Sequence, residues 1–194
     1  MKEAGRGIAL VLALAGVSLG ATVLKLSNQE LTKRADVILH GKCTKKSART
    51  DANIKMTVTD YEFEVTEFLK APDDVKKAGT KFAFTVLGGK LEDGSGTFIS
   101  GIPSYALDEE CILFLDTVHP KTKCRTSIGL AQGKFTVKQE EGSSKKYLSR
   151  EMGDLNLVDE KGHVVGIASK DGLKLYLEVF LKEIKGYLAS GEKK

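Results

Sequence analysis

The sequence lacks the short motifs that identify most metal and hydrolase sites. It contains no CxxC or HxxxH spacing, and its three histidines, His40, His119 and His163, are far apart. Zinc is therefore not expected, because its protein ligands usually come in closely spaced pairs. After the apolar N-terminal segment, neither Gly-x-Ser-x-Gly nor His-Glu-x-x-His occurs, which argues against the hydrolases that use them. We expect no catalytic residue, no metal and no other cofactor.

Neither sign of charge dominates the chain. Its 30 lysines and arginines are nearly balanced by 26 aspartates and glutamates, for a net charge of +4. The two signs are interspersed, so the sequence predicts no strong single-sign field. The aromatic segment 57–70 also carries Asp60, Glu62 and Glu64. Since oligonucleotide binding needs a basic surface with stacking aromatics, nucleic acid is not an expected partner.

The apolar run at residues 8–17 is too short to span a bilayer of about 30 Å. It follows Lys2 and Arg6 and precedes small residues up to Ala21, which is the order of a secretory signal peptide. We expect residues 1–21 to be a signal peptide and 22–194 to form one secreted or periplasmic domain, with no stable membrane insertion after cleavage. A retained N-terminal anchor is the alternative. No cysteine lies near the cleavage region, which argues against a lipoprotein.

The three cysteines, Cys43, Cys111 and Cys124, are an odd number. In an oxidising compartment, one disulfide and one free thiol are the simplest expectation. A hairpin that turns at His119–Pro120 would place Cys111 and Cys124 too far apart for a Cα separation of about 5.5 Å. This favours a bridge that involves Cys43. Three reduced, buried thiols are the alternative.

Alternation of apolar and polar residues predicts a mainly β domain. Strands are expected at 36–46, 57–70, 80–89, 109–117 and 122–139, and a polar stretch, 140–151, separates them from a hairpin at 155–167. Ser27 and Glu30 have the spacing of a capping box, which predicts a short helix at 26–35. Apolar residues at helical spacing predict an amphipathic helix at 171–189 that docks on the domain.

Two glycines, Gly129 and Gly133, interrupt the last predicted strand. Glycine inside a strand permits a bulge or a tight bend, which lets a sheet coil. We therefore expect a small closed or partly open OB-like barrel around a single apolar interior. The alternative is that these glycines bring the backbone close to a ligand.

Six segments carry a resemblance when they are taken in order: LTKRADVILHGKC, YEFEVTEFLKA, GG, GIPSYALDEECILFL, GLAQGKFTV and the terminal YLEVFLKEI. This order, from Leu26 to Leu188, resembles a family of uncharacterised secreted bacterial proteins. Ala71, Tyr105 and Asp108–Glu109 depart from the glycine, phenylalanine and Gly-Glu of that family, which affects its loops.

The segments ADVILHGK and FEVTEFLKAP are more distantly similar to the inhibitory domain of tissue inhibitors of metalloproteinases, a five-stranded OB-type barrel. That similarity implies a barrel. It does not carry the inhibitory activity, which in that family depends on a cysteine at the mature N-terminus. No cysteine lies near Ala21 in this chain, and fold alone does not imply function.

The longest irregular segment, 88–108, is the expected binding region, because long loops in compact domains are often functional. Its Gly-Gly-Lys lacks the Ser/Thr and helix of a phosphate loop. We expect an exported, non-enzymatic binding or interaction module whose partner is an unknown protein or small ligand. A secreted protease inhibitor and a hydrolase are the alternatives. The candidate contact residues, expected to be exposed, are Lys90, Phe98, Ile102, Tyr105 and Lys134.

Overall fold

The computed structural model describes residues 20–167 and 175–191. The predicted signal peptide lies almost entirely outside this range, as do residues 171–174 of the predicted C-terminal helix. Within it, the protein is mainly β, as predicted, with a large antiparallel sheet and a C-terminal helix. No helix in the described part of the chain has the length and apolar character needed to cross a membrane.

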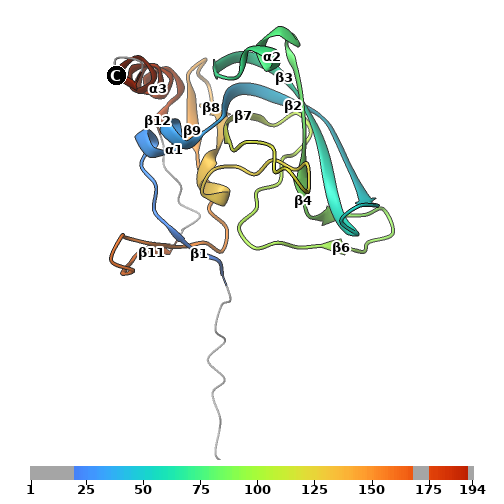
Figure 1. Ribbon diagram of the computed structural model, residues 1–194. Helices are drawn as coiled ribbons and strands as arrows, with labels where there is room; N and C mark the ends of the chain where they lie inside the picture. The colour runs from blue at the N-terminus through green and yellow to red at the C-terminus, as the bar shows by residue number, and fades with distance from the viewer. Residues whose placement is uncertain (1–19, 168–174, 192–194) are drawn as a thin grey trace, which may run out of the picture.

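The helices and strands are shown in Figure 1, where α1 and α3 lie together on one side and the long β2–β3 hairpin lies on the other. In chain order they are β1 (Thr22–Leu24), α1 (Asn28–Arg34), β2 (Val37–Asp51), β3 (Met56–Lys70), α2 (Asp73–Lys77), β4 (Lys81–Leu87), β5 (Gly89–Lys90), β6 (Gly96–Thr97), β7 (Glu110–Leu115), the 3-10 helix η1 (Leu130–Gly133), β8 (Lys134–Gln139), β9 (Lys146–Ser149), β10 (Asn156–Val158), β11 (Val164–Ile167), β12 (Leu175–Tyr176) and α3 (Leu177–Gly191).

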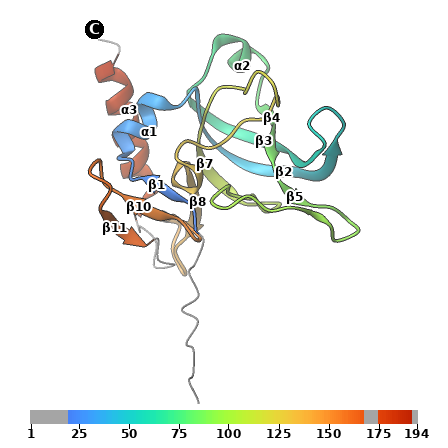
Figure 2. The ribbon, with the colours of Figure 1, turned by 60° about the horizontal axis from the view of Figure 1, so that its bottom comes forward.

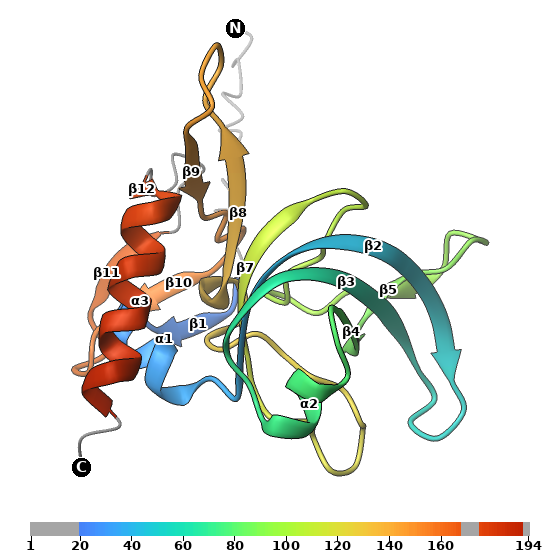
Figure 3. The same ribbon diagram turned by 90° about the horizontal axis from the view of Figure 1, so that it is seen from above.

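The main sheet has seven strands in the order β12-β9-β8-β7-β2-β3-β4, and every neighbouring pair is antiparallel. Strands β2 and β3 are 15 residues each and pair along nearly their whole length. Three register shifts in this pairing, the last between Cys43 and Lys45, increase local coiling. The two strands curve strongly as a result, as Figure 3 shows.

The sheet stays open, because β4 and β12 are its two edges and the described strands form no closed ladder. The segment 116–127 runs beside the edge of β4, where the Arg125 amide donates to the Thr85 carbonyl at 2.8 Å. The predicted turn at His119–Pro120 is present, since the amides of Asp116 and His119 donate to the carbonyls of Thr126 and Cys124, both at 2.9 Å. The returning segment does not continue along β7, because β7 pairs with β8 over Cys111–Leu113. Only Ser127 of that segment bridges Leu115.

Gly129 and Gly133 bracket η1 and not a strand interior. Gly129 has a φ of 64°, a left-handed conformation that favours glycine. At Gly133 a Cβ would approach the carbonyl oxygens of Ile128 and Phe114 to less than 3 Å. The predicted bend is present, but it is a 3-10 turn that precedes β8 and not a bulge inside a strand.

The sheet separates two apolar clusters, so the prediction of a single interior is wrong. One cluster lies on the side of the helices and contains Ile38, Phe114 and Phe180. The other lies on the opposite side and contains Leu39, Phe63 and Tyr105. Successive residues of a strand face opposite sides, and both faces are buried in β7 and in residues 37–41 of β2.

The capping box of α1 is confirmed. The Glu30 amide donates to Ser27 Oγ at 3.2 Å, and the Ser27 amide donates to Glu30 Oε2 at 2.8 Å. Helix α3 packs on α1 and buries Leu177, Phe180 and Ile184. It begins at Leu177, later than predicted, because Leu175–Tyr176 pair with β9 as β12.

The hairpin at 155–167 is present as β10 and β11, which turn at Asp159 as predicted. The Asp159 carboxylate accepts hydrogen bonds from the amides of Lys161 and His163, both at 2.9 Å. With β1 these strands form a second, three-stranded sheet.

Candidate functional site

An open groove of about 580 Å³ lies along the distal half of the β2–β3 hairpin. Residues of β2 and β3 form its floor, and the segments 86–90, 94–99 and 102–104 form its walls. Figure 2 shows the chain through β5 running beside this part of β2 and β3. The volume falls within the range of about 300–1,000 Å³ that is typical of small-molecule sites.

The wall nearest to β4 depends on a close approach between backbone and sheet. The Gly88 amide donates to the Thr57 carbonyl, and Thr59 Oγ1 donates to the Gly88 carbonyl, both at 2.8 Å. A Cβ on Gly89, whose φ is 139°, would overlap Thr59 Oγ1. Glycine is therefore required where the chain leaves β4 and turns back over β3.

Tyr61 and Thr59 lie at the floor of the groove. The ring of Tyr61 packs edge-on against Tyr105, with 4.8 Å between centroids. Burial raises the pKa of the Tyr61 phenol, so this hydroxyl is neutral near pH 7. Lys46 Nζ lies 5.9 Å from the Tyr61 ring centroid, within reach of a weak cation–π contact. The floor thus contains an aromatic ring that is 4% exposed, with an ammonium group beside it.

Of the predicted contact residues, Lys90, Phe98 and Ile102 line the groove. Phe98 is 85% exposed and lies in the wall segment 94–99. The structure does not bring Tyr105 and Lys134 to the groove surface. The expected exposure of Tyr105 is wrong: it is 1% exposed, and burial raises its pKa well above the usual value.

Lys134 is half-buried and anchors the wall segment 102–104. Lys134 Nζ lies 2.7 Å from Glu109 Oε1 and donates to the Ser104 carbonyl at 2.7 Å. Glu109 also accepts hydrogen bonds from the Ala106 amide at 2.9 Å and from Thr136 Oγ1 at 2.7 Å. Burial would raise the pKa of Glu109, but these donors outweigh it and hold the pKa below its usual value. The ion pair holds residues 104–109 against β8.

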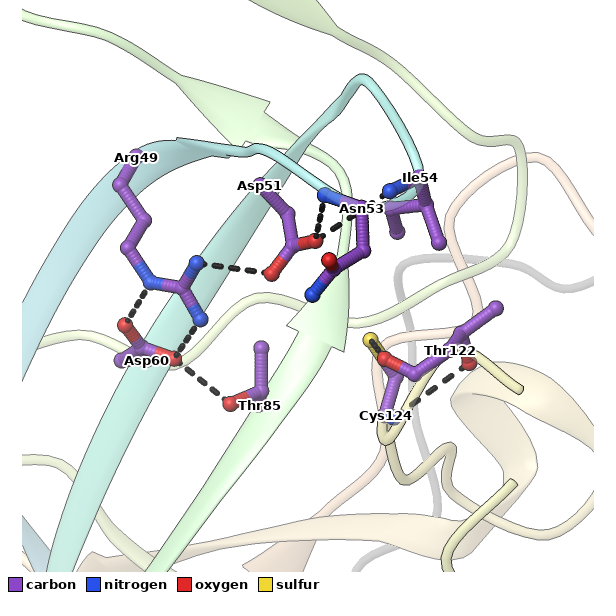
Figure 4. Close-up of polar contacts among 8 residues, drawn as sticks. All are labelled: Arg49, Asp51, Asn53, Ile54, Asp60, Thr85, Thr122 and Cys124. Carbon is purple, nitrogen blue, oxygen red and sulfur yellow. Dashed lines mark hydrogen bonds and ion pairs between the residues drawn. The ribbon is translucent and has the colours of Figure 1, made fainter. Parts of the chain in front are cut away.

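The opposite face of the β2–β3 hairpin carries a network of ion pairs, which Figure 4 shows. Arg49 bridges Asp60 and Asp51, at 2.7 and 2.8 Å, and Thr85 Oγ1 donates to Asp60 at 2.6 Å. The Asp51 carboxylate also accepts hydrogen bonds from the amides of Asn53 and Ile54 in the turn. All charges in this network are paired, which indicates a structural role.

The predicted disulfide is not formed, since Cys43, Cys111 and Cys124 are all free and buried. Gly41 is the direct partner of Cys111, so Cys43 is its diagonal neighbour across β2 and β7. Diagonal neighbours are about 7–8 Å apart, beyond the usual Cα separation of a disulfide. Cys124 lies in the segment beside β4, where its amide donates to Thr122 Oγ1 (Figure 4).

The three histidines have separate partners. His40 lies 2.7 Å from Glu110, His119 lies 3.2 Å from Thr122 Oγ1, and His163 lies 3.3 Å from Asp159. His40 and His163 contact carboxylates, whereas His119 contacts the hydroxyl of Thr122 in an exposed turn, where the same hydroxyl also accepts a hydrogen bond from the Cys124 amide. Among the described residues, no group of three or more His, Cys, Asp or Glu side chains converges as a metal site would need.

Sequence reasoning missed the groove floor. Tyr61 alternates with Phe63 and Val65, a pattern that indicates a core position, and Lys46 is the last residue of the predicted strand 36–46. Strand β2 continues to Asp51, and this extension places Lys46 opposite Tyr61. The length of the predicted strand 57–70 was the available signal, since a 14-residue strand needs a neighbour of similar length.

No protein-family model matches the chain, and no curated protein matches it.

Proposed function

We propose that this protein is an exported, non-enzymatic binding module that holds a small organic ligand in the groove. The proposal depends on one observation: the folded chain itself forms the groove, and the aromatic side chain of Phe98 in its wall is exposed. Phe98 is 85% exposed beside a floor made by Tyr61 and Thr59. Ligand sites typically combine such apolar walls with a few fixed polar groups.

The rigidity of the groove supports this proposal. Tyr105, next to the wall segment 102–104, packs edge-on against three rings, those of Tyr61, Phe63 and Phe84. The Lys134–Glu109 pair secures the same segment. A wall held in place before binding reduces the ordering cost that a ligand must offset.

Export is proposed from the N-terminal segment, where Lys2, Arg6 and the apolar run at 8–17 have the order of a signal peptide. We also infer a partly open OB-like barrel, as in the inhibitory domain of tissue inhibitors of metalloproteinases. The curvature of β2 and β3 supports it, and so does the hydrogen bond from Arg125 to Thr85 that joins the segment 116–127 to β4. Membership of the secreted bacterial family rests on its motif order.

The binding proposal is tested with N-phenyl-1-naphthylamine, a neutral aromatic probe whose fluorescence rises in apolar surroundings. We expect saturable binding, with Phe98→Ala weakening it roughly five- to tenfold, since a lost aromatic pair is worth about 1 kcal/mol plus some buried area. Val118→Ala, which trims another exposed apolar residue (43% exposed), is the matched control and should bind as the wild type does. Absence of saturable binding, or equal binding by Phe98→Ala, would remove the groove as the ligand site.

A further inference from the structure

The charged side chains that line the groove are all positive. Among the described residues that line it, the charged side chains are Lys46 and Lys90, and no carboxylate accompanies them. Glu92 and Asp93 lie in the turn between β5 and β6 but do not line the groove, and Asp93 accepts hydrogen bonds from Ser95. A second hollow, of about 380 Å³ between β9 and α3, contains Glu178 together with Lys145 and Lys146, so its charge is mixed.

Strand β2 shows how unusual Lys46 is within this chain. The other basic residues on its exposed part each have a carboxylate partner: Lys42 pairs with Asp108 at 2.8 Å, Lys45 with Glu62 at 2.9 Å, and Arg49 with Asp60 at 2.7 Å. Within the part of the chain that the structure describes, Lys46 has no carboxylate within 4 Å, and neither has Lys90.

An ammonium group beside an aromatic floor selects its ligand by charge. Lys46 Nζ lies over the Tyr61 ring, and Phe98 lines the same groove. A ligand with an anionic group would meet an unpaired cation and would break no existing ion pair on binding. A cationic ligand would be repelled, and a neutral one would gain only the apolar contact. Electrostatic complementarity of this kind determines specificity.

We propose that the ligand of the groove is a small anionic amphiphile: an apolar, ring-bearing body against Tyr61 and Phe98, with a carboxylate, sulfonate or phosphate group held by Lys46 and assisted by Lys90. This inference rests on the proposed function, because it specifies the chemistry of the same groove. The ligand is a free small molecule and not a membrane surface.

The test compares two probes that differ by one group. N-phenyl-1-naphthylamine is neutral, and 8-anilinonaphthalene-1-sulfonate has the same ring system with a sulfonate. We expect the sulfonate to bind roughly five- to tenfold more tightly than the neutral probe, as one charge-assisted contact allows. Raising the salt concentration from 0.05 to 1 M should reduce this advantage, because exposed charges are then screened.

The matched variants are Lys46→Gln and Lys45→Gln. These residues are neighbours on β2, but Lys45 pairs with Glu62 while Lys46 lies over Tyr61. Lys46→Gln should remove most of the preference for the sulfonate and leave binding of the neutral probe unchanged, whereas Lys45→Gln should retain the preference. Lys90→Gln should reduce it to a smaller extent.

The outcomes separate the two proposals. Equal, Phe98-dependent binding of both probes would overturn the anionic ligand and leave the groove as a binding site. Binding of neither probe would overturn both proposals. Sedimentation with vesicles that contain phosphatidylglycerol provides a further arm: we expect the protein to stay in solution, and co-sedimentation that Lys46→Gln abolishes would overturn the free ligand in favour of a lipid surface.

Discussion

At the scale of single residues, the environment of Glu109 differs from that of its neighbour Asp108 although both carboxylates pair with lysines. The Glu109 side chain is 15% exposed and its partner Lys134 is 16% exposed. The Asp108 side chain is 83% exposed beside Lys42. An exposed pair contributes about 0–1 kcal/mol, while removal of one partner from a desolvated pair is far more costly.

We therefore expect Glu109→Gln to lower the free energy of unfolding at pH 7 by about 2–3 kcal/mol, because Lys134 would be left half-buried without a counter-charge. Asp108→Asn, which tolerates the positive φ of 66° at this position, should change it by less than about 0.5 kcal/mol. Urea denaturation of both variants measures the difference. Similar losses for the two variants would show that the Lys134–Glu109 pair has no special role in the wall.

The stability that Glu109 contributes depends on pH. The folded-state pKa of Glu109 is lowered, so its contribution is present above the unfolded pKa of about 4.3 and is lost as the pH falls through the folded-state value. The stability difference between wild type and Glu109→Gln should accordingly shrink below about pH 4.

At the scale of elements, α1 is the case where sequence and structure agree most closely. Its seven residues are too few for an isolated helix to be stable, so it depends on its cap and on packing against α3. Ser27→Ala should lower the free energy of unfolding by about 1 kcal/mol. Lys33→Ala, at an exposed position in the same helix, serves as the control in chemical denaturation and should cost clearly less. Equal effects would mean that the cap contributes nothing.

Strong alternation made β3 and β4 predictable, and capping and turn chemistry made α1 and the Asp159 turn predictable. The prediction failed where non-local contacts determine structure. Residues 122–127 belong to the predicted strand 122–139 but form a loop beside β4. Leu148 pairs with Val137 although it lies in the polar stretch 140–151. Only Tyr147 and Leu148 are apolar in the strand β9, too few to give a periodic signal.

The walls of the candidate site were predictable from the sequence, but its floor was not. Loop length and glycine content indicated the walls at Lys90, Phe98 and Ile102. The floor comes from the sheet, and the sequence alone does not reveal that β5 folds back over Thr59. Tyr105 and Lys134 lie next to the groove but do not line it. The Tyr105 ring packs in the core, and the Lys134 ammonium group pairs with Glu109 and the Ser104 carbonyl.

At the scale of the whole molecule, the sheet divides two sets of side chains that should respond independently. Phe180 of α3 packs against Phe114 and Phe135, with centroids 6.2 and 4.6 Å away, while the groove floor belongs to the opposite cluster. Phe180→Ala should destabilise the protein by about 3–5 kcal/mol.

The folded fraction of this variant should still bind the neutral naphthylamine probe with the affinity of the wild type, measured well below the unfolding temperature, because mutations far apart with no shared partners act additively. The control is Phe98→Ala, which should weaken probe binding and leave stability nearly unchanged, since its side chain is 85% exposed. A loss of probe affinity in Phe180→Ala would show that the two halves are coupled through the sheet.

The three buried thiols have a practical consequence for work with this protein. Since Cys43, Cys111 and Cys124 do not depend on oxidation for their packing, the folded chain needs no oxidant during production and tolerates reducing buffers. Burial also raises the pKa of each of these thiols, which slows their reaction with maleimides. A cysteine introduced at an exposed position near the groove would thus take up a fluorescent label selectively, and a single dye could report occupancy of the groove in the otherwise native protein.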